Sequence, residues 1–499
     1  MSTIHQRALL LAILACCMFG CSKFLDDPQS STSLPVEAAF QNGQDLEEAL
    51  TGVYDLCQDG HLYGRNFIVL PELIGGNAVF YGGGFFGLEY VSALNMTATD
   101  WYAENSWLTA YAAINQLNAV LAFLPGIRNS DAALSNSQAN RIEGEALFLR
   151  GLLYFDLVRL FALPIGLNAG QQPGVPLMLN PVLKKEDFQF PEQASVVKVY
   201  EQINRDLAAA LPLLPEYNST GRPGQHAARA FLARMAFQEG RYSDAASYTE
   251  AMLSSAFDLT DSPQDFFTTE GNTEEIWTLP CSPEDPNGGL STVFGLGGGN
   301  QTFATADYLQ AQQEIISPAQ QNALGQAGYT AVDLRTDTGY LVTHPLLVQD
   351  GVVGWRTNKF EQVQEESDDI PMVRFAEILL LRAEALARLQ GSNTESVELL
   401  NRVRRRAIRV VDAGKQLVPG GAGFIEYKTG DFPDANSLIE AIIRERRIEL
   451  AFEGNFFHDQ MRLQRPVQGL GYDTCRLRLP IPQRELDVNP NLKQHSCYQ

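Results

Sequence analysis

The densest cluster of ionisable side chains lies near the C-terminus, between Glu445 and Arg462. Glu449 and Glu453 are four residues apart, so a helix would place both carboxylates on one face, as paired-carboxylate hydrolysis would require. Positive neighbours lower a carboxyl pKa, whereas a general acid needs a raised one. The arginines within or beside this segment are Arg444, Arg446, Arg447 and Arg462. The pattern therefore predicts a structural ion-pair network, and we expect Glu145 and Arg150 to serve in the same way.

Other signatures of catalysis or of a bound group are missing from the sequence. The six histidines are far apart and show no HExxH or other metal-ligand spacing, so we predict neither a metal centre nor a cofactor. Gly295-Leu296-Gly297-Gly298-Gly299-Asn300 has neither the Lys-Ser/Thr of a phosphate-binding loop nor a helix pattern after it, and we interpret it as a surface loop. Calcium binding by loop Asp and Asn side chains stays an open question.

Two loop-rich stretches, residues 60–100 and 255–370, hold many aromatic residues and no sustained helical period. Long loops in a compact protein are usually functional. Sugars present flat apolar faces edged by hydroxyl groups, so a sugar site needs exposed aromatic rings beside hydrogen-bonding groups. The predicted ligand-binding residues are Asn77, Tyr81, Trp101, Tyr102, Tyr308, Trp355 and Arg356, with Phe85, Phe86 and Tyr340 as further aromatic candidates.

Amphipathic helices must position these loops. Apolar residues recur at helical spacing over residues 45–56, 107–124, 141–161, 196–214, 227–238, 244–253, 376–407 and 439–452. Pro125-Gly126 predicts the end of the second helix. Trp107 falls on the apolar side of its helix and Trp277 within a short apolar strand pattern, so both are predicted to be core residues.

The string LARMAFQEGRYSDAASYTEAML, residues 232–253, resembles a tetratricopeptide unit, and residues 376–407 form a second such string. Small alanines let two helices approach closely. One helix pair cannot bury its apolar face alone, so such pairs stack. The predicted fold class is therefore mostly α, a tetratricopeptide-like helical-repeat scaffold with a large loop-rich insertion.

Residues 1–20 are typical of a secretory signal peptide. The uncharged run from Ala8 to Phe19 is shorter than the roughly 20 residues that span a bilayer. Gly20-Cys21 then resembles a bacterial lipobox, which predicts lipidation of Cys21, a tether over residues 21–44 and a folded domain over 45–499. Ile13 to Cys16 offers an earlier lipobox, and a plain cleaved signal is the other alternative.

The charge of the protein limits its possible binding partners, and its cysteines limit the possible metal sites and disulfides. The net charge is −22, from 59 acidic and 37 basic side chains, so nucleic acid is an unfavourable partner and anionic lipid would not hold the protein by charge. Cys57, Cys281, Cys475 and Cys497 show no CxxC spacing, which gives a zinc site no support. In an exported chain, Cys475 and Cys497 are the favoured disulfide pair, although the sequence leaves the pairing open.

Several motifs occur in the order typical of one family. They are Cys21-Ser22-Lys23-Phe24-Leu25-Asp26, Thr51-Gly52-Val53-Tyr54, Trp107 to Asn118, Glu145 to Phe155, Glu445 to Gly454, and Leu479-Pro480-Ile481-Pro482. In this order the chain resembles the SusD/RagB nutrient-binding lipoproteins from Cys21 to Tyr498. It departs from their pattern at Gln494 to Tyr498, which reads QHSCY where Q-N-x-G-Y is usual.

The resemblance implies an α–α superhelix of four tetratricopeptide-like helix pairs. It also implies an outer-membrane lipoprotein that faces the cell exterior and covers the opening of a SusC-like TonB-dependent transporter as a lid. Such a protein captures oligosaccharides, or sometimes peptides, without catalysis. Family members often carry a carboxylate where Asn77 stands here. Alternatives that remain open are a peptide-capturing lid, a pure helical-repeat interaction scaffold and a surface glycoside hydrolase.

Overall fold

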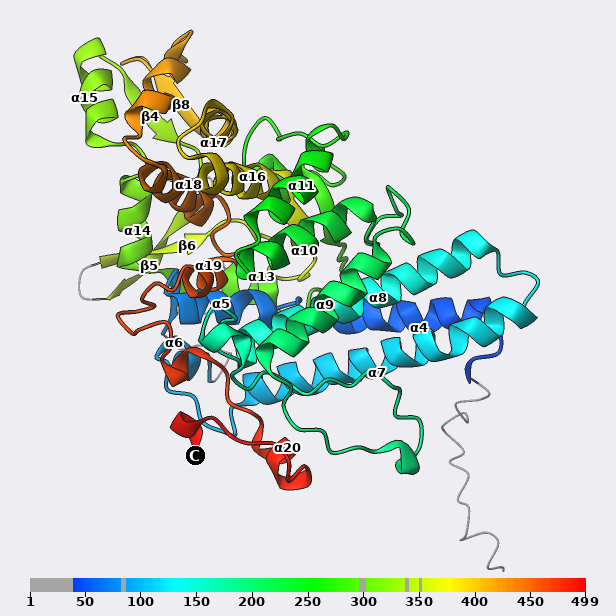
Figure 1. Ribbon diagram of the computed structural model, residues 1–499. Coiled ribbons are helices and arrows are strands. Elements are labelled where there is room, and N and C mark those ends of the chain that lie inside the picture. Colours follow the sequence, from blue (N-terminus) through cyan, green and yellow to red (C-terminus); the bar gives the residue numbers. More distant parts are fainter. Residues whose placement is uncertain (1–38, 82–86, 296–301, 337–340, 350–351) are drawn as a thin grey trace, which may run out of the picture.

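The structure is a computed structural model that describes residues 39–499 apart from 82–86, 296–301, 337–340 and 350–351. Long helices form the body of the molecule, and short strands and loops gather on one side of it (Figure 1). The predicted lipidation site Cys21, most of the tether, Phe85, Phe86 and Tyr340 lie outside the described residues.

Four long helices form the N-terminal half of the scaffold and pack in sequence, α4 on α7, α7 on α8 and α8 on α9 (Figure 1). Side-chain caps fix their starts: Asp100 accepts a hydrogen bond from the Ala103 backbone N–H, and Ser135 with Gln138 forms a capping box. The bounds are α4 (Gly43–Gln58), α7 (Trp101–Ser130), α8 (Asn136–Phe161) and α9 (Val196–Ala210).

The predicted stop at Pro125 is wrong, because α7 continues to Ser130. Proline in a helix interior removes one hydrogen bond and crowds the preceding turn. Here Pro125 faces solvent, and contacts beyond it hold the last turn: Ile127 is buried, and Arg128 bonds Asn140 and Glu143 of α8. Tertiary packing therefore overrides the local stop signal.

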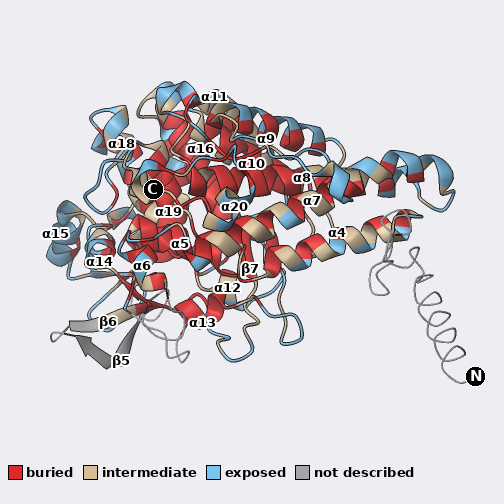
Figure 2. Cartoon of the chain, turned by 90° about the horizontal axis from the view of Figure 1, so that it is seen from below, coloured by how far each residue is buried: buried red, intermediate tan, exposed pale blue. Residues whose placement is uncertain are grey.

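The two predicted tetratricopeptide-like units are confirmed as helix pairs, α10 (Gln225–Gln238) with α11 (Tyr242–Leu253) and α16 (Phe375–Gln390) with α17 (Thr394–Ala407). Although distant in sequence, α11 packs against α16, so the units stack. Buried alanines allow this approach, since Ala233 and Ala236 of α10, Ala245 of α11 and Ala385 of α16 form one cluster. The mostly helical fold class is therefore confirmed, and Figure 2 shows α8, α10 and α16 among its buried elements.

The remaining helices of the scaffold and its C-terminal part are short, except for α18. They are α5 (Asn66–Gly75), α6 (Leu88–Ser92), α18 (Ala435–Glu449), α19 (Phe456–Arg462) and α20 (Gln483–Val488).

The stretch predicted to be loop-rich, residues 255–370, contains short elements that show no sequence period. Its strands form antiparallel pairs, among them β1 with β3 and β2 with β7, which join positions far apart in the chain. The polar helices α14 and α15 were not predicted because they lack an apolar stripe. The elements are α12 (Asp265–Thr268), α13 (Leu290–Phe294), α14 (Ala306–Gln313), α15 (Pro318–Ala327), β2 (Glu275–Leu279), β3 (Thr302–Ala304), β4 (Thr330–Asp333), β5 (Leu341–Gln349), β6 (Val352–Thr357) and, at its end, β7 (Ile370–Arg374). Two strands outside this stretch pair with it, β1 (Ala78–Phe80) with β3 and β8 (Ile408–Val411) with β4.

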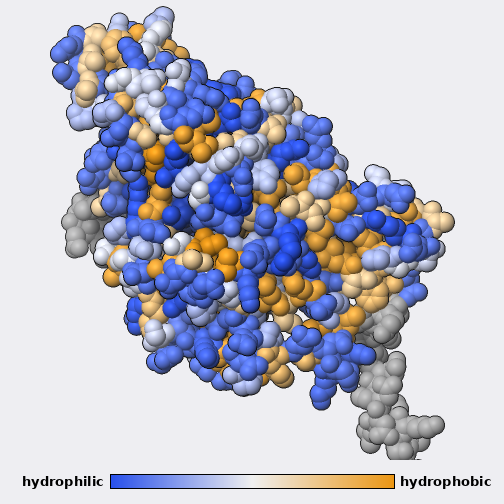
Figure 3. Space-filling model, in the orientation of Figure 1, coloured by the Kyte–Doolittle hydropathy of each residue, from blue (hydrophilic) through white to orange (hydrophobic). Residues whose placement is uncertain are grey.

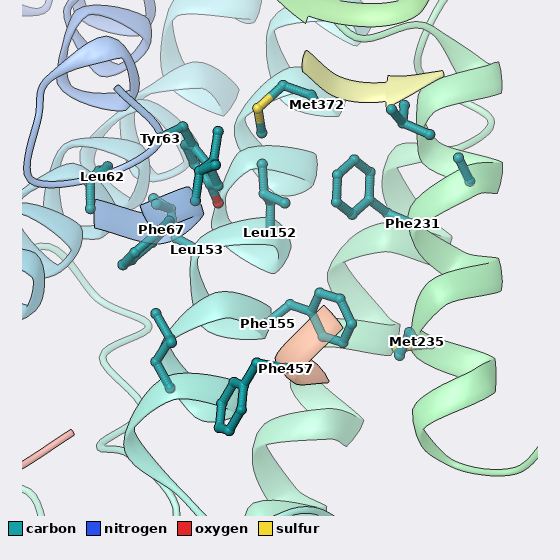
Figure 4. Close-up of a cluster of buried hydrophobic side chains, with 14 of the residues drawn as sticks. Leu62, Tyr63, Phe67, Leu152, Leu153, Phe155, Phe231, Met235, Met372 and Phe457 are labelled. Carbon is teal, nitrogen blue, oxygen red and sulfur yellow. The ribbon is translucent and has the colours of Figure 1, made fainter. Parts of the chain in front are cut away.

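The main hydrophobic core lies between the helix layers. Figure 4 shows part of it, with Leu152 of α8 lying between Tyr63 and Phe231 of α10. Trp107 and Trp277 are buried, as predicted. The favoured Cys475–Cys497 disulfide is also present and ties the C-terminal segment to itself.

Candidate ligand-binding surface

The charged C-terminal cluster belongs to a buried ion-pair network, as predicted, but the arginines next to it in the sequence are not the partners of Glu449 and Glu453. Arg446 pairs with Glu377 and Arg462 with Glu384. Glu449 is fully buried and pairs with Arg335, Arg374 and Arg406. Burial alone would raise the pKa of Glu449, but the three guanidinium groups outweigh it and hold the pKa well below its usual range. Glu453 pairs with Arg374 in the same network. A carboxylate held ionised, as Glu449 is, does not supply the protonated acid that glycoside hydrolysis needs.

Glu145 and Arg150 also serve structural ion pairs, as expected. Buried Glu145 accepts hydrogen bonds from Tyr54 and Arg222, each at 2.8 Å. Arg150 donates to both carboxylate oxygens of Asp206, at 2.8 and 2.6 Å. These pairs bind α4, α8, α9 and the turn before α10 into one scaffold.

An exposed aromatic platform lies at the start of α7. Trp101 is 51% exposed, and its ring centre lies 5.1 Å from those of His61 and Tyr102. The Arg65 guanidinium carbon lies 5.7 Å from the Trp101 ring centre. His61 Nδ1 lies 2.5 Å from a carboxylate oxygen of Asp59, and the hydrogen bond from His61 lowers the pKa of Asp59. We call these five residues the Trp101 cluster: one aromatic face bordered by hydrogen-bonding and charged groups.

The early and late loop-rich stretches meet beside this cluster. Residues 59–64 approach Gly288 so closely that a Cβ on Gly60 would lie 2.2 Å from the Gly288 carbonyl oxygen. Only glycine allows this contact. Arg65 adds a hydrogen bond of 3.4 Å to the same carbonyl. The arrangement agrees with a site built from both stretches.

A second aromatic group lies where β1, β3 and β6 come together. Tyr81, 54% exposed, follows β1, and its ring centre lies 5.8 Å from that of Phe303 in β3. Gly354 of β6 packs under Phe303, since a Cβ there would lie 2.5 Å from the ring. Trp355, next in β6, is partly exposed. Gly87 lies beside the Trp101 cluster, since a Cβ there would lie 3.2 Å from the Tyr102 ring.

The structure corrects four of the predicted ligand contacts, because their side chains are buried. Tyr102 lies beneath Trp101, and burial raises its pKa to about 12. Asn77 donates to Glu72 and accepts from Arg447, both at 2.9 Å. Tyr308 packs against Phe452. Arg356 donates to the Gly295 carbonyl at 2.9 Å, under the Phe303 ring. These four support the surface from below, while Tyr81, Trp101 and Trp355 reach it.

Sequence reasoning missed Asp59, His61, Arg65 and Phe303 as neighbours of the aromatic surface. The available signal was the short run from Asp59 to Arg65, where two glycines flank a histidine and a tyrosine. Phe303 carried no signal, since only its pairing with Val79 across β1 and β3 places it there.

A separate apolar cavity of about 610 Å³ lies between α7, residues 176–191 and α20. Trp107 and Tyr111 form one wall, and the exposed Phe188, Phe190 and Val488 lie at its edge. On the face shown in Figure 3, apolar patches alternate with polar surface. The chemistry of this cavity suits an apolar side chain better than a sugar.

The fold and surface together define a helical-repeat protein that carries an aromatic surface on inserted loops. Residues 23–237 match a family model described as "Starch-binding associating with outer membrane", and residues 302–475 match the SusD family model. Together the two models cover most of the chain, which belongs to the SusD/RagB family.

Curated relatives match over nearly their whole length. SusD-like protein P2 of Formosa agariphila is 26% identical over 98% of this chain and 99% of its own. SusD-like protein P38 of the same organism is 25% identical over 96% of each.

Solved structures share the fold. A SusD superfamily protein from Bacteroides thetaiotaomicron superposes with a TM-score of 0.74 at 22% identity, covering 91% of this chain and 100% of its own. A laminarin-binding SusD-like protein gives a TM-score of 0.67 at 22% identity, covering 92% and 100%.

Proposed function

We propose that this protein captures glycans at the cell surface, without catalysis, and delivers them to a SusC-like TonB-dependent transporter in the outer membrane. The observation that carries the proposal is the Trp101 cluster, an exposed indole face beside His61, Asp59 and Arg65 on loops of a SusD/RagB scaffold. An indole face stacks on the apolar face of a sugar, and the neighbouring groups bond its hydroxyls. The family description and the laminarin-binding structural neighbour support glycan as the ligand class.

The proposed binding residues are Trp101, Tyr81 and Trp355, with His61 added from the structure. Arg65 is 6% exposed and supports the Trp101 ring from the protein side. The anchor would be the lipid on Cys21, and the tether would let the protein move relative to the transporter. The buried carboxylates of the ion-pair network support a binding role over hydrolysis.

Calorimetry on residues 22–499 with a panel of neutral oligosaccharides and peptides tests the proposal. We expect saturable binding of an oligosaccharide. In Trp101→Ala the affinity should fall at least about tenfold, a loss of about 1.4 kcal/mol of binding free energy. Phe188→Ala is the matched control, since it removes an exposed aromatic ring away from this surface. A peptide signal would keep the transport role and change the cargo. Equal binding by the wild type and Trp101→Ala would refute the proposed site.

A second candidate function is a protein-interaction scaffold, favoured by the exposed Phe188 and Phe190 at the apolar cavity. Exposed apolar patches of this kind often mark protein contacts. Co-purification with a SusC-like transporter is expected of both candidates, so the binding panel has to distinguish them. The scaffold is favoured if Phe188→Ala/Phe190→Ala no longer co-purifies with the transporter and the wild-type protein binds none of the sugars and peptides in the panel.

A further inference from the structure

A small cavity of about 210 Å³ lies between the turn before α10, the start of α10 and strand β2. Residues 216–222 form one side, residues 275–278 the other, and His226 and Phe257 contribute the remaining aromatic surface. None of these residues belongs to the Trp101 cluster or to the group around Tyr81. The cavity is smaller than the roughly 300–1,000 Å³ of sites for drug-sized ligands, so it suits a single ring.

His226 is the unusual group in this cavity. It is 4% exposed, yet neither ring nitrogen has a hydrogen-bond partner among the described residues. A carboxylate oxygen of Glu216 lies 3.7 Å from Nε2, which is too far for a hydrogen bond. The ring is fixed by Tyr217 at 5.0 Å and Phe257 at 5.2 Å between ring centres. A buried polar group left unpaired is costly, so His226 retains bonding capacity for a ligand.

The other large polar side chains around the cavity already have partners. Asn218 and Arg222 bond Glu145, Asn272 bonds two backbone carbonyls, Trp277 donates to the Gly221 carbonyl, and Glu275 accepts from Thr278. Free hydrogen-bonding capacity is therefore concentrated at His226 and at Glu216, whose side chain is 67% exposed.

Burial, together with the nearby Arg229, lowers the pKa of His226 below its usual value, so the ring is neutral at pH 7. A neutral imidazole donates from one nitrogen and accepts at the other. Glu216 adds an acceptor that would repel an anionic ligand, and two side chains are too few to ligate a metal ion. Tyr217, 50% exposed, offers an aromatic face at the rim. A ligand whose hydroxyl groups both donate and accept, carried on a ring with an apolar face, matches the hydrogen-bonding groups of His226 and Glu216 and the aromatic face of Tyr217.

We propose that this cavity is a second carbohydrate site that binds one neutral sugar ring through His226, Glu216 and Tyr217. It is independent of the Trp101 cluster, because the two share no side chain. A glycan held at both sites would make two separate contacts with one molecule, which raises avidity without enlarging either site.

Saturation-transfer NMR with the methyl glycosides of glucose, galactose and mannose tests this proposal. The protein is residues 22–499 carrying Trp101→Ala, so that the signal reports sites other than the Trp101 cluster. We expect a glycoside signal in this background that falls at least tenfold when His226→Phe is added. Phenylalanine keeps an aromatic ring, larger by one atom, between Tyr217 and Phe257 and removes both ring nitrogens.

Glu216→Ala in the same background is the second variant, since an exposed carboxylate can be removed without disturbing the fold; it should weaken the signal several-fold. No glycoside signal in the Trp101→Ala background, or a signal that persists after His226→Phe, would overturn the second site. Neither result bears on the proposed main site, which is judged by the loss of oligosaccharide binding in Trp101→Ala alone.

Discussion

Replacing Glu449 by glutamine removes the charge at the centre of the buried ion-pair network. Arg335, Arg374 and Arg406, all buried, then share fewer carboxylates. Breaking a buried pair by removing one partner costs about 3–5 kcal/mol, because an uncompensated charge stays buried. We expect Glu449→Gln to lower the free energy of unfolding by that amount.

The corresponding change in melting temperature follows from the chain length. The entropy of unfolding is about 2.1 cal/mol/K per residue, or about 1 kcal/mol/K for the roughly 460 residues from Ala39 onward. The melting temperature should therefore fall by about 3–5 °C, measured by circular dichroism at neutral pH.

Glu440→Gln is the matched control on the same helix. Glu440 pairs with Arg465, but its side chain is 52% exposed, and such surface pairs contribute less than about 1 kcal/mol. Its melting temperature should change by about 1 °C or less. Equal shifts in the two variants, or an unchanged Glu449→Gln protein, would refute the network as a stabilising element.

The difference in melting temperature between the wild type and Glu449→Gln should also depend on pH. The folded-state pKa of Glu449 lies far below its ordinary value of 4.5, so its stabilising contribution is complete above that value and is lost as the pH falls toward the folded pKa. The gap in melting temperature between wild type and Glu449→Gln should therefore narrow from about pH 6 to about pH 3. A gap that widens on acidification would contradict the assignment.

Three further outcomes are expected. Trp277→Ala should cost about 3–5 kcal/mol in chemical denaturation, since the buried indole packs on Phe148 and donates a hydrogen bond of 3.0 Å; a cost below about 1 kcal/mol would contradict its core role. Reducing the Cys475–Cys497 disulfide, which closes a separation of 22 residues, should lower the free energy of unfolding by about 3 kcal/mol, and a Cys475→Ser/Cys497→Ser protein should show no response to the reductant. Gly354→Val should weaken oligosaccharide binding in calorimetry by displacing the β6 hairpin, whereas Gly325→Ala, with open space around it, should not.

The scaffold could be predicted because its signals are local. Alanine and leucine recur at helical spacing through α10, α11 and α16, and the arginines that flank Glu449 in the sequence indicate an ion-pair network. Trp107 and Trp277 lie within apolar patterns that fix their burial. These inferences need only neighbours within about two helical turns. The partners of Glu449 do not follow from such neighbours, because Arg335, Arg374 and Arg406 lie 43 or more positions away in the sequence.

The loop-borne surface could not be predicted in the same way, because distant partners decide which side chains reach solvent. Tyr308 and Arg356 lie in a stretch without periodicity, yet both are buried. The three-residue strand β1 is too short to show alternation, and its pairing with β3 joins residues more than 200 positions apart. Aromatic content identified the segments that carry the exposed Tyr81 and Trp101, but only the long-range pairings separate these two residues from the buried ones beneath them.

The partners of Asn77 explain why an amide stands where the family resemblance implies a carboxylate. Its amide nitrogen donates to Glu72 while its oxygen accepts from Arg447, so the two ends of the amide meet opposite charges. Burial raises the pKa of Glu72 to about 7, which shows how little room this position has for a second negative charge. An aspartate could still accept from Arg447 but would place a carboxylate against Glu72. The Asn77 amide therefore links Glu72 of α5 to Arg447 of α18 directly before β1, and so helps to position the strand that leads to Tyr81.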